Sequence, residues 1–412
     1  MLNLSYLLEL YLRNKYKKML TKSIKQLTIV LFSLGLFACG STEQPQVDLT
    51  KLPDDIGYTG DGLLKENLEA IRLAYNLPAL AGMLIKGDEI LEMDVTGFRD
   101  TNQLDEVTIN DRWHIGSLTK SMTATLAARL VEQGLISFQS TVSEIFPELI
   151  GDIKPIYEDV TLAELLTSTS GLRRDLPGSW DNEWKNRSDS LVEQRQEWTK
   201  KMFNTQPETE RGKHLYSNGG YTIAGHMLEK VSNMSWETLI ENELFSPLNM
   251  INTGFGPPNF DQSSDQISGH YFDNGSWHAR NPSDGVHVPF VMGPAGTVNA
   301  NLSSLAKYLM AHLSGSQGGN NIISANSYQI LHQAVDADYA MGWGSFNVPW
   351  TSGKILTHGG SNSYWLAEWM IVPEENFAVV VIFNATGDNV SQAQGKIMGM
   401  LIDRYGATLE SD

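Results

Sequence analysis

Residues 377–383 read Phe-Ala-Val-Val-Val-Ile-Phe, an apolar run with no polar interruption. Side chains alternate between the two faces of a strand, so a strand that is apolar throughout is typical of burial on both faces. The apolar stretch Trp365–Val372 precedes this run, and Pro373-Glu-Glu-Asn376 lies between them. The sequence therefore predicts an antiparallel hairpin, covered by a last helix over roughly Val390–Tyr405.

A second hairpin is predicted near the other end of the chain, from Ala81–Ile85 and Ile90–Val95 around the turn Lys86-Gly-Asp-Glu89. A helix is expected just before it, over Leu63–Tyr75. The segments between the hairpins have mostly helical periodicity, namely Leu118–Gln133, Leu162–Leu166, Tyr221–Ser232, Trp236–Glu243 and Leu302–Leu313. We predict an α/β (α+β) fold, in which N- and C-terminal segments form one antiparallel sheet flanked by helices, with an inserted, mostly helical region.

The composition excludes several classes of protein. The 412 residues are 41% hydrophobic and 19% charged, which excludes a disordered or fibrous chain. The net charge is −18, and no basic stripe offsets it, so the sequence predicts no nucleic-acid partner. One cysteine permits neither an intramolecular disulfide nor a zinc site built mainly from thiolates. His270, His278 and His287 lie within one polar loop, but their spacing fits no zinc pattern, so we expect no metal and no cofactor.

The N-terminal residues have the layout of an export signal. Lys22 and Lys25 precede the apolar run Leu27–Ala38, which is too short to span a bilayer comfortably. The tetrapeptide Leu36-Phe-Ala-Cys39 resembles a bacterial lipoprotein box, in which the cysteine is acylated and anchors the protein to a membrane. A simple cleaved signal and an uncleaved N-terminal anchor are the alternatives.

Three segments follow from this layout. Residues 1–38 are predicted to be a signal peptide, with Met19 as an alternative true start, and residues 39–52 a lipid-anchored or flexible tether. Residues 53–412 form the globular domain. We expect an exported protein: a membrane-anchored lipoprotein facing the periplasm or cell exterior, or else a secreted or periplasmic one.

Ser117-Leu-Thr-Lys120 is the first motif with catalytic potential. It opens a predicted helix, where a serine and a lysine three residues later share one face. A serine hydroxyl needs a base, and a desolvated lysine can be one. The same pattern recurs at Ser304-Leu-Ala-Lys307, where Ser303 or Ser304 reads as a helix cap and the lysine as an exposed helix residue, so SxxK alone is a weak signal.

Two further motifs lie just before a clearly predicted helix or strand. Tyr216-Ser-Asn218 supplies a phenol that can shuttle a proton and an amide that can orient a lysine and a substrate carbonyl. His358-Gly-Gly360, followed by Ser361, precedes the strand Trp365–Val372, and its glycines permit close approach of a ligand to the backbone. Taken singly, each also fits an ordinary structural role, a packed loop tyrosine or a turn histidine.

The order and spacing of these motifs resemble the penicillin-recognising serine hydrolases related to class C β-lactamases. That family includes D-alanyl-D-alanine carboxypeptidases, D-aminopeptidases and serine esterases, and the resemblance covers nearly all of residues 60–405. Further similar stretches are Trp113–Lys120, Leu165–Leu172, Pro294–Val298 and Tyr339–Trp343. The resemblance predicts a β-lactamase/transpeptidase-like fold.

The resemblance also implies a role for each motif residue. Ser117 attacks a carbonyl and forms an acyl-enzyme, while Lys120 and Tyr216 share the proton transfers and Asn218 positions lysine and substrate. The backbone N–H groups of Ser117 and Ser361 form an oxyanion hole, with His358 and Gly360 beside the substrate. Which of Lys120 and Tyr216 is the base stays open.

Departures from the family pattern bear on the substrate. Many relatives carry lysine and threonine where this chain has His358 and Gly359, so the threonine hydroxyl is absent and the charge is expected to depend on pH. We therefore expect small esters, amides or D-amino-acid peptides as substrates rather than efficient β-lactam hydrolysis. The alternatives are a β-lactam-binding, β-lactamase or DD-peptidase type of protein, and a non-catalytic protein that binds cell-wall peptide or lipid. The polar stretch Gly178–Lys201 reads either as a lid or as a surface loop; oligomeric state is not indicated.

Overall fold

The computed structural model describes residues 44–185, 187–260, 265–285 and 287–411. The predicted signal peptide and Cys39 lie outside the described residues. Within the predicted tether, Leu49–Lys51 form a short 3-10 turn, η1, and the backbone N–H of Asp48 donates to the carbonyl of Ala74 over 2.7 Å. No helix in the described ranges is both long enough and apolar enough to cross a membrane.

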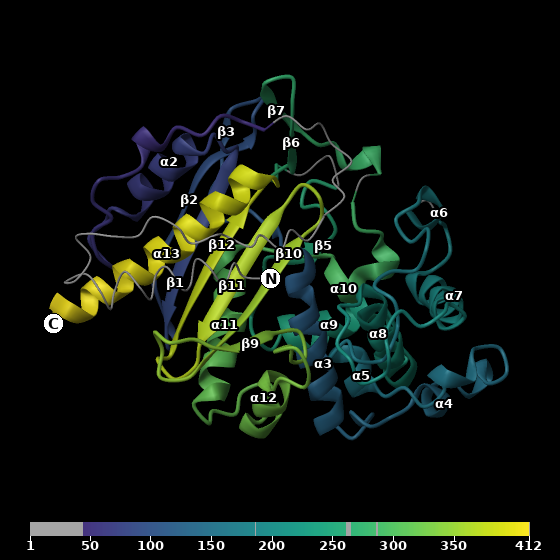
Figure 1. The fold of residues 1–412 in the computed structure, drawn as a ribbon. Helices are drawn as coiled ribbons and strands as arrows, with labels where there is room; N and C mark the ends of the chain where they lie inside the picture. The colour runs from purple at the N-terminus through teal and green to yellow at the C-terminus, as the bar shows by residue number, and fades with distance from the viewer. Residues whose placement is uncertain (1–43, 186, 261–264, 286, 412) are drawn as a thin grey trace, which may run out of the picture.

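In the described part of the chain, seven strands form one antiparallel sheet in the order β3-β2-β1-β12-β11-β10-β9. Their bounds are β1 Ala79–Lys86, β2 Glu89–Asp100, β3 Asp105–Glu106, β9 Gly344–Asn347, β10 Lys354–Ser361, β11 Leu366–Val372 and β12 Phe377–Phe383. The N-terminal β1 pairs directly with the C-terminal β12, so both ends of the chain build one sheet (Figure 1). The predicted fold class is confirmed.

The two faces of β12 pack against different hydrophobic clusters, because consecutive side chains point to opposite sides of the sheet. Every residue of β12 is buried. Ala378, Val380 and Ile382 belong to the larger cluster, which continues into the helical middle of the chain. Phe377, Val379, Val381 and Phe383 belong to the second cluster, with side chains of the N- and C-terminal helices. The sheet is therefore the middle layer of a sandwich.

The helices are placed on both faces. In Figure 1, α13 crosses one face of the sheet beside α2, and α11 lies behind the sheet. The helical region beside the sheet contains α3 to α10. The bounds are α2 Leu64–Ala74, α3 Thr119–Glu132, α4 Val142–Ile145, α5 Leu162–Leu166, α6 Asn182–Lys185, α7 Leu191–Phe203, α8 Asn218–Ser232, α9 Trp236–Ile240, α10 Gly293–Gly296, α11 Leu302–Ser316, α12 Ala325–His332 and α13 Asp388–Ser411.

Short strands complete the frame of the helical region. β4 (Trp113–His114), β8 (Val298–Ala300) and β5 (Thr253–Phe255) form a three-stranded sheet, and β6 (His270–Asp273) pairs with β7 (Ser276–Ala279). β4 leads directly into the turn before α3, and β8 follows α10. These strands therefore fix the start of α3 and the end of α10 relative to each other.

Two sequence predictions were wrong in detail. His358 and the glycines after it lie inside strand β10, not at a turn before β11. In the described part of Gly178–Lys201, α6 covers Asn182–Lys185 and α7 begins at Leu191, so this stretch is mostly helical and is not one continuous loop. Its Trp184 and Trp198 are buried, while Trp180 is exposed.

Buried histidines predict acid sensitivity of the fold. Burial lowers the pKa of six histidines in the described ranges, to about 3 for His114, His332 and His358, to about 4 for His270, well below the ordinary value for His312, and below it for His287. In the unfolded chain they titrate near 6.5, so below this pH the unfolded state binds more protons and stability falls. The loss approaches about 1.4 kcal/mol per pH unit for each histidine.

We therefore expect the melting temperature to drop between pH 7 and pH 5. Burial raises the pKa of Glu368 to about 7, so this one carboxyl opposes the drop, but the histidines outnumber it. Calorimetry or circular dichroism measures it. A His332→Asn variant, which removes one of the six groups, is expected to show a shallower dependence of melting temperature on pH. A melting temperature independent of pH over this window would contradict the assignment of neutral histidines.

Candidate active site

Ser117 lies in the short 3-10 turn η2 (Gly116–Leu118) that leads into α3, and its side chain is partly exposed. Gly116 has φ +53°, a left-handed conformation that glycine adopts without strain. Its backbone N–H donates to His114 Nδ1 over 3.1 Å, which holds the turn against β4. The serine is thus presented on a tight, supported turn at the start of a helix.

Lys120 is one helical turn further on and fully buried. Its Nζ lies 2.7 Å from Asn218 Oδ1, 2.6 Å from the carbonyl oxygen of Ala295 and 3.1 Å from Ser117 Oγ. The first two oxygens can only accept, so they take two N–H groups of the amine. A neutral amine then has its lone pair left for the third contact, the Ser117 hydroxyl, which can donate.

Burial favours that neutral form. Desolvation lowers the pKa of Lys120 well below its ordinary value; the nearby Asp175 carboxylate opposes this shift and Arg174 adds to it. Desolvation raises the pKa of the Tyr216 phenol, and its hydrogen bond with the Ser117 side chain offsets part of the rise. An amine that is easily deprotonated and a phenol that keeps its proton thus share one hydroxyl.

Tyr216 and Asn218 are placed by the start of α8. Ser217 caps this helix: its Oγ accepts from the N–H of Gly220 over 2.9 Å and donates to the carbonyl of Arg173 over 2.8 Å. The Tyr216 ring lies with its centroid 4.8 Å from Lys120 Nζ. The structure therefore brings Ser117, Lys120, Tyr216 and Asn218 together, although about 100 residues separate the two pairs.

The end of β10 lies against the serine turn, and two glycines permit this. A Cβ on Gly360 would lie 2.0 Å from the carbonyl oxygen of Ile115 and 2.8 Å from Ser117 N. A Cβ on Gly116 would lie 2.6 Å from Ser361 N. The backbone nitrogens of Ser117 and Ser361 therefore lie on directly facing segments, as the two donors of an oxyanion hole require.

The expectation of a pH-dependent charge at position 358 is wrong for the physiological range. His358 is buried, and desolvation and the nearby Lys120 lower its pKa to about 3. His358 Nδ1 lies 2.6 Å from the carbonyl oxygen of Gly342, so Nδ1 carries the proton and donates. The imidazole is neutral at neutral pH, and this position supplies no cation to a substrate.

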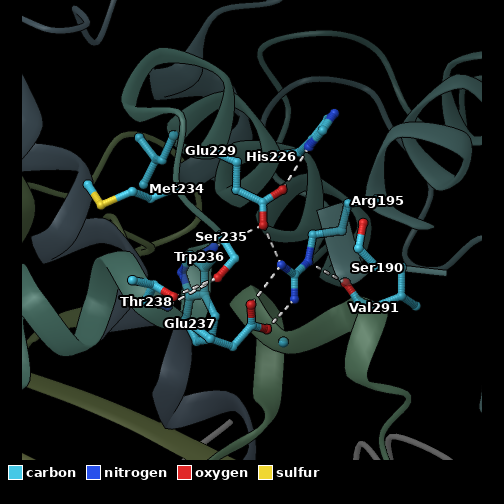
Figure 2. A network of polar contacts seen from close by, with 12 residues as sticks. Ser190, Arg195, His226, Glu229, Met234, Ser235, Trp236, Glu237, Thr238 and Val291 are labelled. Atoms are coloured by element: carbon cyan, nitrogen blue, oxygen red, sulfur yellow. Dashed lines mark hydrogen bonds and ion pairs between the residues drawn. The ribbon is translucent and has the colours of Figure 1, made fainter. Parts of the chain in front are cut away.

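A buried ionic network around Arg195 holds the segment that precedes α10 (Figure 2). Arg195 of α7 is fully buried between Glu229 of α8 and Glu237 of α9, with Nη1 2.5 Å from Glu229 Oε1. Its Nε donates to the carbonyl of Val291 over 2.9 Å. This contact precedes α10, whose Ala295 carbonyl accepts from Lys120.

The sequence analysis did not identify several residues that surround Lys120. Ala295 lies in the family-like stretch Pro294–Val298, so the resemblance held a signal for it. Asp175, which accepts from Asn218 Nδ2 over 2.8 Å, and Arg195 lie in segments with no periodicity that marks them. The second SxxK motif is capped by Asn301, not by Ser303 or Ser304, and Lys307 Nζ donates to the carbonyl of Asn249.

Residues 61–398 match the model of the Beta-lactamase family, and the chain belongs to this family. Beta-lactamase-like protein 2 of Dictyostelium discoideum is 32% identical over 180 residues, which are 42% of this chain and 32% of that protein. Protein flp of Staphylococcus aureus strain COL is 20% identical over 320 residues, 76% of this chain and 61% of that protein. The match thus spans less than two thirds of the length of either relative.

The fold is shared with a solved structure. The octameric penicillin-binding protein homologue from Pyrococcus abyssi superposes with a TM-score of 0.68 at 23% sequence identity, covering 82% of this chain and 78% of that chain. At this identity the likeness establishes the fold alone.

The two glycines of β10 provide a matched test of the oxyanion geometry. Gly360→Ala forces a Cβ into the backbone of the serine turn, whereas a Cβ on Gly359 meets no atom closer than 4.0 Å. Loss of one oxyanion donor costs about 100- to 1000-fold in rate. We expect Gly360→Ala to slow labelling of Ser117 by a fluorophosphonate to this extent and Gly359→Ala to label within a few-fold of the parent. Equal labelling of the two variants would contradict the geometry.

Proposed function

We propose that the protein is a serine hydrolase that cleaves ester or amide substrates through an acyl-enzyme on Ser117. The observation that carries this proposal is the set of contacts of the buried Lys120 amine, two to carbonyl oxygens and the third to the Ser117 hydroxyl. Family membership supports the class of reaction.

In the first half-reaction the proton of Ser117 Oγ passes to Lys120 Nζ as Oγ bonds to the substrate carbonyl carbon. The N–H groups of Ser117 and Ser361 donate hydrogen bonds to the carbonyl oxygen and stabilise the negative charge that develops there. The bond from the carbonyl carbon to the leaving group then breaks. The Tyr216 phenol gives its proton to the leaving group, and the Lys120 ammonium restores the phenol with the proton it took from Ser117. Water cleaves the ester on Ser117 by the same proton path in reverse.

The pKa directions support Lys120 as the base. A lysine whose pKa is lowered gives up its proton more readily than an ordinary lysine, while a tyrosine whose pKa is raised holds its proton. We therefore assign general-base action to Lys120 and proton delivery to Tyr216. Lys120→Met is expected to abolish turnover, and Tyr216→Phe to impair leaving-group departure.

The neutral His358 and the missing hydroxyl at Gly359 favour substrates without a carboxylate beside the reacting carbonyl. Uncharged esters and amides fit this proposal. D-amino-acid peptides also fit it if residues other than His358 and Gly359 bind their carboxylate. The second candidate function, binding of β-lactams or cell-wall peptide without turnover, is kept because some members of the family are not catalysts. Export and lipidation at Cys39 are part of the proposal.

One experiment separates these functions. The purified protein is incubated with p-nitrophenyl butyrate, a fluorescent fluorophosphonate and a fluorescent penicillin, beside Ser117→Ala and Ser304→Ala variants. We expect ester turnover in the parent and in Ser304→Ala, the serine of the other SxxK motif, and none in Ser117→Ala. Stable penicillin labelling without turnover would favour the binding function, and absence of all labelling would overturn the hydrolase.

A substitution at position 358 tests the substrate preference. His358→Lys introduces a cation where many relatives carry one, so a carboxylate-bearing acyl donor gains an ion pair that an uncharged ester cannot use. We expect the ratio of penicillin labelling rate to p-nitrophenyl butyrate turnover to rise at least about tenfold. An unchanged or lower ratio would contradict the role given to His358.

A further inference from the structure

The Asp175 carboxylate lies at the edge of the Lys120 site and has no role in the reaction described above. Its Oδ1 accepts from Asn218 Nδ2 over 2.8 Å, while Asn218 Oδ1 accepts from Lys120 over 2.7 Å. The Asp175 side chain is 24% exposed, and the guanidinium of Arg174 is its ion partner at 3.5 Å. One amide therefore connects a carboxylate to the catalytic amine.

A carboxylate can only accept hydrogen bonds, so it determines which end of the Asn218 amide faces it. The NH₂ end must point to Asp175, and the oxygen must point to Lys120. In the reversed orientation the amide NH₂ would face the amine and the amide oxygen would face the carboxylate. The amine lone pair would then accept from Asn218 and would no longer be free for Ser117.

We propose that Asp175 is a positioning residue that locks the Asn218 amide with its oxygen toward Lys120, and thereby directs the amine lone pair to the Ser117 hydroxyl. This inference rests on the proposed function and adds a residue that touches neither the substrate carbonyl nor Ser117 in that scheme. Its effect passes entirely through Asn218 and through the charge at Lys120.

The charged and titratable groups around the Lys120 amine determine in which direction loss of the Asp175 charge shifts the pKa of Lys120. Asp175 stabilises the ammonium form, whereas Arg174 and the Lys120 burial oppose it. His358 is neutral, and the phenols of Tyr216 and Tyr221 keep their protons because burial raises the pKa of both. Loss of the Asp175 charge therefore lowers the pKa of Lys120, and activity persists to lower pH.

The test compares Asp175→Asn with Asp175→Glu. Asparagine is nearly isosteric but carries both a donor and an acceptor, so it permits either orientation of Asn218; glutamate keeps an acceptor-only group. Asp152→Asn is the control, because it removes a carboxylate from an exposed pair with Lys200 at 2.5 Å and contacts no residue of the site. Measured are kcat and KM for p-nitrophenyl butyrate against pH, the melting temperature, and the fluorophosphonate labelling rate of Ser117.

For Asp175→Asn we expect kcat to fall about tenfold or more with little change in KM, labelling to slow in parallel, and the acid limb of kcat/KM to move to lower pH. Asp175→Glu should retain most activity, and Asp152→Asn all of it. Parent-like rates and acid limb in Asp175→Asn would overturn the inference. Equal losses in both Asp175 variants together with a lowered melting temperature would also overturn it, since they indicate a structural role.

The labelling arm separates this inference from the proposed function. Labelling of Ser117 by the fluorophosphonate needs only an activated hydroxyl, so the labelling rate can be measured even if the protein turns over no ester. A parent without Ser117-dependent turnover overturns the hydrolase. A parent whose labelling is unaffected by Asp175→Asn overturns only the positioning role.

Discussion

The burial of one amine among acceptors is the constraint on which the site depends. A lysine ammonium is costly to desolvate, so a fully buried Lys120 is held either by compensating charge or in its neutral form. Here two carbonyl oxygens, from Asn218 of α8 and Ala295 of α10, occupy two N–H groups and leave one direction, toward Ser117. In the proposed mechanism, the reactivity of Ser117 follows from the direction of the Lys120 lone pair.

This arrangement requires that α3, α8, α10 and β10, which carry Lys120, Asn218, Ala295 and Gly360, are held at fixed distances from one another. The Arg195 network joins α7, α8 and α9 to the segment before α10, and the glycines at 116 and 360 let β10 contact the serine turn. Helices and strands hold functional side chains in position more precisely than loops do. Buried ion pairs add little net stability. We therefore infer that the main effect of the ionic network is to position the Ala295 carbonyl.

The sheet could be predicted because continuous apolar runs such as Phe377–Phe383 have few alternatives to a doubly buried strand. The Ser117–Lys120 contact could be predicted because three residues make nearly one helical turn. Strand β10 could not, since it begins with a lysine and ends in His-Gly-Gly-Ser, with no apolar alternation at that end. The neutrality of His358, the contact of Asp175 with Asn218 and the ion pairs of Arg195 depend on burial and on partners distant in sequence, which no local pattern encodes.

The account is tested most directly by the protonation state of Lys120 itself. The protein is labelled with [¹³Cε]lysine, and the Lys120 resonance, assigned by its absence in Lys120→Met, is followed by NMR against pH. We predict that it titrates well below the other lysines and is neutral at the pH of maximal ester turnover. A Lys120 resonance that titrates near the ordinary lysine value of about 10.4 would contradict the claim that this amine is the base.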